Sequence, residues 1–242
     1  MSTGSGCVAS TTARTRAPDA SSIGGAVLRV AAVVVAALLP LFFVANAMRL
    51  LLSETYVRAA TPRLDGGSLG DARRTELALV GLRAVDPLRG SRIEILRGPR
   101  LDDGSRAFTG REVRHMRDVR AWIWRLHVFE IAVAASLVVL ALRARVTLVW
   151  VLVRGAVVTA AIAVLAFVAM LLNFDVVLLG FHKLLFEGES WHFRDSDTLI
   201  RVYPEEFWSG TGLAIGTLAL AQAAIAFAIG KAFAGRSRTA AA

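Results

Sequence analysis

The chain has 242 residues, of which 55% are hydrophobic, with a mean hydropathy of +0.57 and a formal net charge of +9. This hydrophobic share lies above the usual range of soluble domains and indicates a membrane protein. The charge does not indicate a nucleic-acid partner, because only Lys183 and Lys231 of the 28 basic residues are lysine and the arginines are mixed with acids rather than gathered in a stripe. Cys7 is the single cysteine, so an intramolecular disulfide is excluded.

The N-terminal part predicts a tail followed by a membrane span. Residues 1–25 are mostly Ser, Thr, Ala, Gly and Arg without periodicity, which predicts a disordered cytoplasmic tail. Residues 30–48 carry no charge, so we expect a span at about 27–52. Ala45-Asn46-Ala47 resembles a signal-peptide cleavage site. An uncleaved anchor is favoured, because the apolar run resumes at Leu50 and the upstream basic residues are spread over a long tail.

The loop between the first and second spans, residues 53–121, has its own structural signals. Residues 71–86 place Leu77, Leu82 and Val85 on one helical face, and Asp86-Pro87 ends that helix. Residues 93–96 and the turn at Asp103-Gly104 predict a small hairpin. Thr109 and Glu112 form a capping box that begins a helix leading into the second span, with Trp122 and Trp124 at the membrane interface.

Three further apolar segments complete the predicted architecture. Spans are expected at about 122–142, 148–173 and 207–230, followed by a cytoplasmic tail at 233–242. The fourth starts at Pro204-Glu205-Glu206-Phe207-Trp208, since proline and acids suit a first helical turn. Gly212 and Gly216 form a GxxxG pattern, expected to pack helices within the chain. The predicted fold is an all-α polytopic membrane protein. It has four transmembrane helices, a large extracytoplasmic loop after the first, and an amphipathic or re-entrant connector between the third and fourth.

Short basic loops predict the orientation. Basic residues precede the first span, follow the last, and occupy the turn at Arg143 and Arg145, so both termini are expected in the cytoplasm of a multi-pass plasma-membrane protein. Residues 53–121 and 174–206 then lie outside. Because a tight turn joins the second and third spans, we expect these spans to run side by side with their outer ends close together.

His115 and His182 are the main candidates for chemistry. His115 and Asp118 share a helical face, where a carboxylate could orient an imidazole base, although a solvated helix face would look the same. His182 lies beside the apolar stripe of an amphipathic helix at 175–187, at the depth of a lipid ester, although a lone interfacial histidine often has no role. Asp197 is a weaker candidate for orienting His182. His192 is favoured as an anchor at the lipid headgroups.

Two other arrangements are open. His127 and Glu130 lie one turn apart in the second span, where a structural pairing is favoured over a functional role. A zinc site could draw on His115, Asp118, His182 and Asp197, since zinc accepts imidazole and carboxylate, but no spacing matches a ligand signature and no metal is expected.

Several motifs together resemble a known family. They are residues 108–120, FTGREVRHMRDVR; 180–186, GFHKLLF; Trp191; 197–200, DTLI; and 203–208, YPEEFW. In this order they resemble the DUF1461 family of integral membrane proteins, which includes the lipoprotein intramolecular transacylases. The resemblance covers roughly residues 27–230, with the first half of the outer loop matching loosely.

The resemblance implies an acyltransferase that moves an acyl chain of a diacylglyceryl-modified N-terminal cysteine onto the amine of that cysteine, leaving a lyso-form lipoprotein. His115 and His182 would be the catalytic pair and would meet in one pocket, supported by Asp118, Asp197 and Trp191. The implied partners are the lipid bilayer and a diacylated lipoprotein, without a cofactor. Imidazole suits this chemistry, because a group that titrates near 6.5 can exchange protons with both the amine and the leaving oxygen. The alternatives are a non-catalytic membrane scaffold that binds a partner and a metal-dependent membrane hydrolase.

Overall fold

Four long helices dominate the computed structural model, which describes residues 20–63, 69–188 and 190–239. By length and composition each is able to cross a membrane: α1 (Ala20–Leu51), α4 (Gly110–Arg143), α5 (Arg145–Leu172) and α8 (Glu205–Thr239). The predicted fold class is therefore confirmed. The helices are longer than the predicted spans: residues 20–25 belong to α1, and α8 starts directly after Pro204 as expected and continues to Thr239. The rest of the two predicted tails, residues 1–19 and 240–242, lies outside the described residues.

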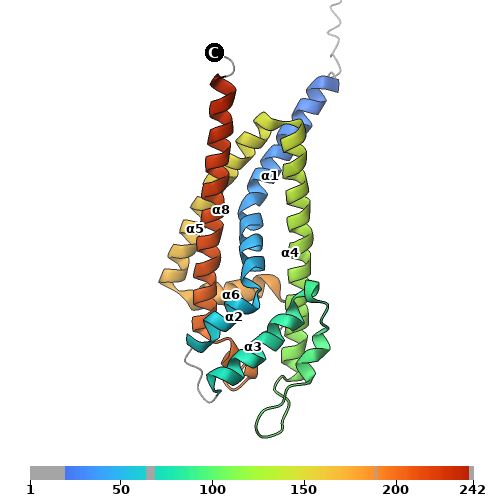
Figure 1. Ribbon diagram of the computed structural model, residues 1–242, viewed down its shortest axis with the longest axis vertical. Helices are drawn as coiled ribbons and strands as arrows, with labels where there is room; N and C mark the ends of the chain where they lie inside the picture. The colour runs from blue at the N-terminus through green and yellow to red at the C-terminus, as the bar shows by residue number, and fades with distance from the viewer. Residues whose placement is uncertain (1–19, 64–68, 189, 240–242) are drawn as a thin grey trace, which may run out of the picture.

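Short elements lie together at one end of the bundle. Between α1 and α4 the chain forms α2 (Glu54–Ala60), η1 (Thr61–Arg63), α3 (Asp71–Val85), η2 (Pro87–Arg89) and η3 (Ile93–Arg97). Between α5 and α8 it forms α6 (Phe174–Leu185) and α7 (Thr198–Val202). Figure 1 shows these elements at the end opposite the start of α1, the end of α8 and the α4–α5 turn. The three short basic segments thus share one end of the molecule, as the predicted topology requires.

The outer-loop elements have a hydrophobic core of their own, which we call the cap core. It is formed by fully or almost fully buried side chains: Leu77, Leu82, Leu96, Phe108, Val113, Met116, Leu199 and Val202. Helix α3 ends before Asp86-Pro87, as predicted. Because the cap core includes residues of α4 and α7 as well as α3, it fixes both of these elements relative to the outer loop.

The predicted hairpin is wrong in its first strand. Ile93–Arg97 forms the 3₁₀-helix η3, in which Ile93 and Leu96 are both buried in the cap core. Their spacing of three residues suits a helical face and not the two-residue alternation of a strand. The predicted turn does form: an isolated bridge joins Arg100 and Arg106, and Gly104 has a φ of 80°.

The membrane part has a second core, separate from the cap core. Its buried residues are Ala32, Ala36, Leu39, Phe43, Val133, Leu140, Val151, Ala156, Ala219, Ala223 and Ala226. Close helix approach depends on glycine: a Cβ at Gly155 would collide with Leu39 of α1, and a Cβ at Gly212 would lie 2.9 Å from Met170 of α5. Packing within the chain is thus confirmed for Gly212, whereas a Cβ at Gly216 would meet no atom within 4 Å.

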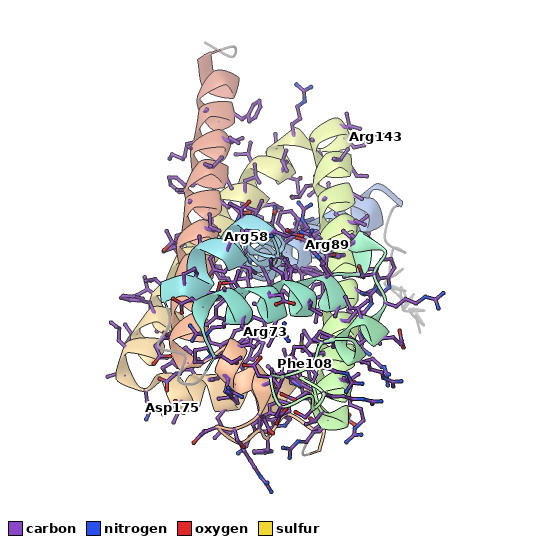
Figure 2. The ribbon with its side chains drawn as sticks, turned by 60° about the horizontal axis from the view of Figure 1, so that its bottom comes forward. Arg58, Arg73, Arg89, Phe108, Arg143 and Asp175 are labelled. Carbon is purple, nitrogen blue, oxygen red and sulfur yellow. The ribbon has the colours of Figure 1, made fainter. Side chains whose placement is uncertain are left out.

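Helices α4 and α5 do not run side by side as expected. They leave the turn at Ala144 and diverge, and α1, which packs against both, lies between them (Figure 1). The residue at the turn has φ −148° and ψ 60°, outside the helical region, so the two axes need not continue in parallel. Helix α6 connects the separated ends of α5 and α4. It starts near Asp175 (Figure 2) on the side of α5 and leads back toward α4 (Figure 1).

Candidate active site

His115 lies in the second turn of α4, and the predicted capping box fixes where that turn begins. The Thr109 hydroxyl accepts a hydrogen bond from the Glu112 amide at 3.3 Å, and the Glu112 carboxylate accepts one from the Thr109 amide at 2.7 Å. Helix α4 has 34 residues, about 51 Å of rise, against a bilayer core of about 30 Å. Since the apolar part starts near Trp122, the turns that carry His115 project beyond the span.

His182 lies near the end of α6, and a backbone carbonyl orients its ring. The Asn173 side chain caps the start of α6 by accepting a hydrogen bond from the Val176 amide at 3.1 Å. The Nδ1 atom of His182 lies 2.8 Å from the carbonyl oxygen of Leu178, which can only accept a hydrogen bond. Nδ1 therefore carries the hydrogen, and Nε2 of the neutral ring keeps a free lone pair.

The structure brings His115 and His182 together. Their ring centroids are 6.1 Å apart and the rings are nearly parallel, at 22°. No hydrogen bond joins the two rings in the described structure, so no ring nitrogen of either histidine is occupied by the other histidine. The expected meeting of the two histidines in space is confirmed. Helix α6 brings them together, because it crosses back toward α4.

Aromatic side chains surround both histidines. Phe186 contacts both rings, at 4.8 Å from His115 and 5.7 Å from His182, and Phe193 lies edge-on to His115 at 5.3 Å. Trp191 stacks on His182 at 5.3 Å. His115 is 8% exposed, and its Nδ1 atom has no hydrogen-bond partner among the described residues. A charged His115 would be a cation buried among aromatic rings, which is costly, so this site favours its neutral form.

The predicted supporting residues are placed unequally. Trp191 contacts His182 as described. Asp118 is exposed and does not bond His115, and Asp197 accepts hydrogen bonds from Arg111 at 2.7 Å and from the Arg194 amide at 2.8 Å, so neither orients a histidine. The alternative zinc ligands consequently do not gather: no group of three His, Cys, Asp or Glu side chains is arranged to hold a metal within the described residues.

Three contacts of the site were not anticipated from the sequence. The Glu112 carboxylate, 0% exposed, also accepts a 2.7 Å hydrogen bond from the Leu199 amide. The Arg111 guanidinium lies 5.5 Å from the centroid of the Phe193 ring. The Trp122 indole donates a 2.7 Å hydrogen bond to the carbonyl oxygen of Leu185. In two of these contacts one partner is a backbone atom, and residue type does not indicate which backbone atom will form such a bond.

Two other polar features lie apart from the histidine pair. His127 and Glu130 are buried and 3.1 Å apart, which confirms the expected pairing, and Glu130 also lies 3.7 Å from Arg49 of α1. An open cavity of about 620 Å³ between α2 and α3 is lined by residues that include Arg58 and Arg83 and neither histidine. Figure 2 shows Arg58 on α2.

The fold and site define a class: a polytopic membrane protein whose extramembrane cap brings two histidines together among aromatic rings. Residues 89–208, which contain both histidines, match the family model of the lipoprotein intramolecular transacylase Lit. This segment, 120 of the 242 residues, therefore matches the Lit family, the kind of protein that the motifs of the chain resemble.

The chain is also similar to individual proteins and solved structures. An uncharacterised protein of Aquifex aeolicus is 36% identical over 137 residues, which is 56% of this chain and 61% of the relative, so the match spans less than two thirds of the relative's length. The structure of the lipoprotein intramolecular transacylase Lit from Bacillus cereus has a TM-score of 0.72, with 18% identity, over 89% of this chain and 99% of that one. A variant of the same protein with a histidine replaced by arginine gives 0.68, with 17% identity, over 90% of this chain and 96% of that one. At these identities the structures show a shared fold.

Proposed function

We propose that this protein is a lipoprotein intramolecular transacylase that moves an acyl chain from a diacylglyceryl group to the α-amine of the cysteine bearing it. The observation that carries the proposal is the meeting of His115 and His182 at 6.1 Å within the segment that matches the family. A membrane-surface site suits such a substrate, since α6 exposes Val176, Phe181 and Leu184 while it carries His182 between them.

The reaction sets the number of protons to be moved. The amine nitrogen attacks the ester carbonyl, a C–N bond forms and the C–O bond to the glyceryl group breaks. Starting from an ammonium, the nitrogen loses two protons: one ends on the glyceryl oxygen and one is released to water. Donor and acceptor belong to one lipopeptide, so proximity lowers the barrier without an enzyme nucleophile. The enzyme has to supply a base, an acid and stabilisation of the oxyanion.

His182 is the base in this proposal. Its Nδ1–H is held by the Leu178 carbonyl, so Nε2 is available to take a proton from the amine and to return one to the glyceryl oxygen. The same ring serves both steps because the proton leaving the nitrogen is the one the leaving oxygen needs.

His115 is the donor to the oxyanion. Its buried Nδ1 has no partner in the described structure, so the neutral tautomer with hydrogen on Nε2 avoids an orphaned buried N–H. That N–H can stabilise negative charge on the carbonyl oxygen in the transition state, as neutral imidazoles do elsewhere. Trp191, Phe186 and Phe193 limit water around the two rings.

The site faces the outside of the cell in this proposal, with both termini in the cytoplasm. An impermeant thiol reagent on intact cells, applied to a Cys7→Ser background, tests this orientation. Ser105→Cys, in the exposed turn of the cap, should react, and Arg143→Cys, in the turn between α4 and α5, should react only after permeabilisation. The reverse pattern would invert the assignment.

The activity is tested in a bacterial host that has no other N-acylating enzyme. Mass spectrometry of lipoprotein N-terminal peptides should show one acyl chain on nitrogen and one on glycerol when this protein is expressed. Cells with the empty vector should keep both chains on glycerol. If the acyl chains occupy the same positions in both strains, with the protein present and folded in the membrane, the proposed transacylase activity is refuted. The alternative of a non-catalytic scaffold would then be favoured.

A further inference from the structure

One hydrogen bond connects the two helices that carry the histidines. The Nε1 atom of Trp122 in α4 donates to the carbonyl oxygen of Leu185, the last residue of α6, at 2.7 Å. It is the one hydrogen bond between α4 and α6 in the described part of the chain, although the two helices lie 63 positions apart at this contact. The Arg125 guanidinium lies 4.8 Å from the centroid of the indole and holds it in place.

The position of the acceptor makes this bond informative. The last carbonyls of a helix have no partner within the helix, so their bonds show what the helix end is attached to. The His182 carbonyl is satisfied by the Phe186 amide at 2.9 Å, and the Leu185 carbonyl is satisfied by Trp122. His182 and Leu185 belong to the same final turn of α6, so the indole fixes the turn that carries the proposed base.

The rest of α6 is attached elsewhere. Its N-terminal part follows α5, which diverges from α4, and its outer face exposes Leu179 and Leu184. Aromatic contacts also join the His115 ring to the rings of His182 and Phe186, with centroids 6.1 and 4.8 Å apart. A hydrogen bond of 2.7 Å is directional and sets the register of the α6 end along α4.

We propose that Trp122 is a positioning residue for the transacylase reaction: its indole N–H holds the His182 turn at the distance from His115 that the reaction requires. This inference rests on the proposed function for its kinetic consequence. Its structural consequence, the fixed register of α6 on α4, does not depend on the reaction.

Trp122→Phe removes the N–H and keeps an aromatic ring, and Trp124→Phe is the matched control. Trp124 lies two residues further along α4, is 53% exposed, and has no hydrogen bond in the described structure. We expect Trp122→Phe to lower kcat per folded molecule about tenfold, the effect of losing one well-placed hydrogen bond, with KM for a diacylated lipopeptide unchanged. Trp124→Phe should match the unsubstituted protein.

A distance measurement separates positioning from loss of folding. Spin labels at Arg117→Cys of α4 and Lys183→Cys of α6, both exposed sites, in the Cys7→Ser background report the α4–α6 distance in micelles. We expect a narrow distribution with Trp122 present, a broader one in Trp122→Phe, and no change in Trp124→Phe.

The outcomes are distinct. Equal distance distributions and equal kcat in the two Phe variants would overturn the positioning role. A broadened distribution in Trp122→Phe, while even the protein with Trp122 gives no lyso-form product, would uphold the register and refute the proposed function. A fall in folded protein with unchanged kcat per folded molecule would make Trp122 structural only and would also overturn the proposal.

Discussion

The carboxylate of Glu112 and the backbone amide of Leu199 are joined by a 2.7 Å hydrogen bond that ties the start of α4 to α7 across 87 positions of the chain. The other carboxylate oxygen accepts the Thr109 amide, so one fully buried acid serves two elements. The connector that carries Trp191 and Phe193 lies between α6 and α7. Glu112 therefore holds the C-terminal end of this connector on the same helix as His115.

We expect Glu112→Gln to lower the free energy of unfolding by about 2–3 kcal/mol. Glutamine has one acceptor oxygen for two N–H donors, so its amide group would face one of them without a bond. Thermal or denaturant unfolding in micelles measures the change. Glu94→Gln is the control, because Glu94 is exposed, and it should stay within about 0.5 kcal/mol. Similar stabilities for the two variants would contradict the role given to Glu112.

Substitution by glutamine should affect activity differently at the two histidines. His182→Ala and His182→Gln should both lower acyl transfer by up to about 10⁴-fold, because neither side chain can act as a base. His115→Ala should lower it by about 10²–10³-fold, and His115→Gln should recover part of that loss, because an amide N–H can still donate to the oxyanion. Quantitative mass spectrometry of lyso-form peptides, per amount of folded protein, measures all four. A His115→Gln protein as inactive as His115→Ala would argue for proton transfer at His115.

Asp118 and Asp197 should also differ. Asp118 is exposed and makes no hydrogen bond or ion pair with His115 in the described structure, so Asp118→Asn should keep activity within about twofold. Asp197 accepts hydrogen bonds from Arg111 and the Arg194 amide, and Arg111 lies over the Phe193 ring that contacts His115. Asp197→Ala should therefore lower activity about tenfold through a displaced Phe193. A larger effect at Asp118 than at Asp197 would restore the interpretation that Asp118 orients the base.

The buried pair His127–Glu130 should matter for stability and not for the reaction. Along α4 the pair begins about 18 Å from His115, at 1.5 Å per residue. Glu130→Ala leaves His127 without its partner and should cost about 3 kcal/mol. A double-mutant cycle with His127→Ala should give a coupling energy of about 1 kcal/mol. Loss of acyl transfer in folded Glu130→Ala protein would show that the pair has a further role.

The sequence predicted the features that depend on local signals. Apolar runs gave the four long helices, Thr109 and Glu112 gave the start of α4, and Pro204 gave the start of α8. The sequence wrongly predicts a strand at Ile93 and Leu96, because a short apolar stretch fits either a strand or a helical turn. For these elements the information lies within a few residues of the element itself.

The geometry of the site depended on information that residue types do not contain. His115 and His182 were expected to meet because α4 and α5 would run together, yet these helices diverge and α6 makes the return. Asp118 and Asp197 were expected to orient the rings, but the Leu178 carbonyl does so for His182. A backbone carbonyl is present at every position, so sequence cannot indicate which one will serve as the acceptor.

Both ends of the described chain lie at the end of the bundle opposite α2, α3 and α6 (Figure 1). An affinity tag, a fluorescent fusion or a surface tether that follows Thr239 therefore starts at the end of the bundle opposite the cap and α6. The protein can be immobilised in nanodiscs through its C-terminus with the proposed site turned toward the solution. Lipopeptides supplied from that side would then reach it in a flow cell.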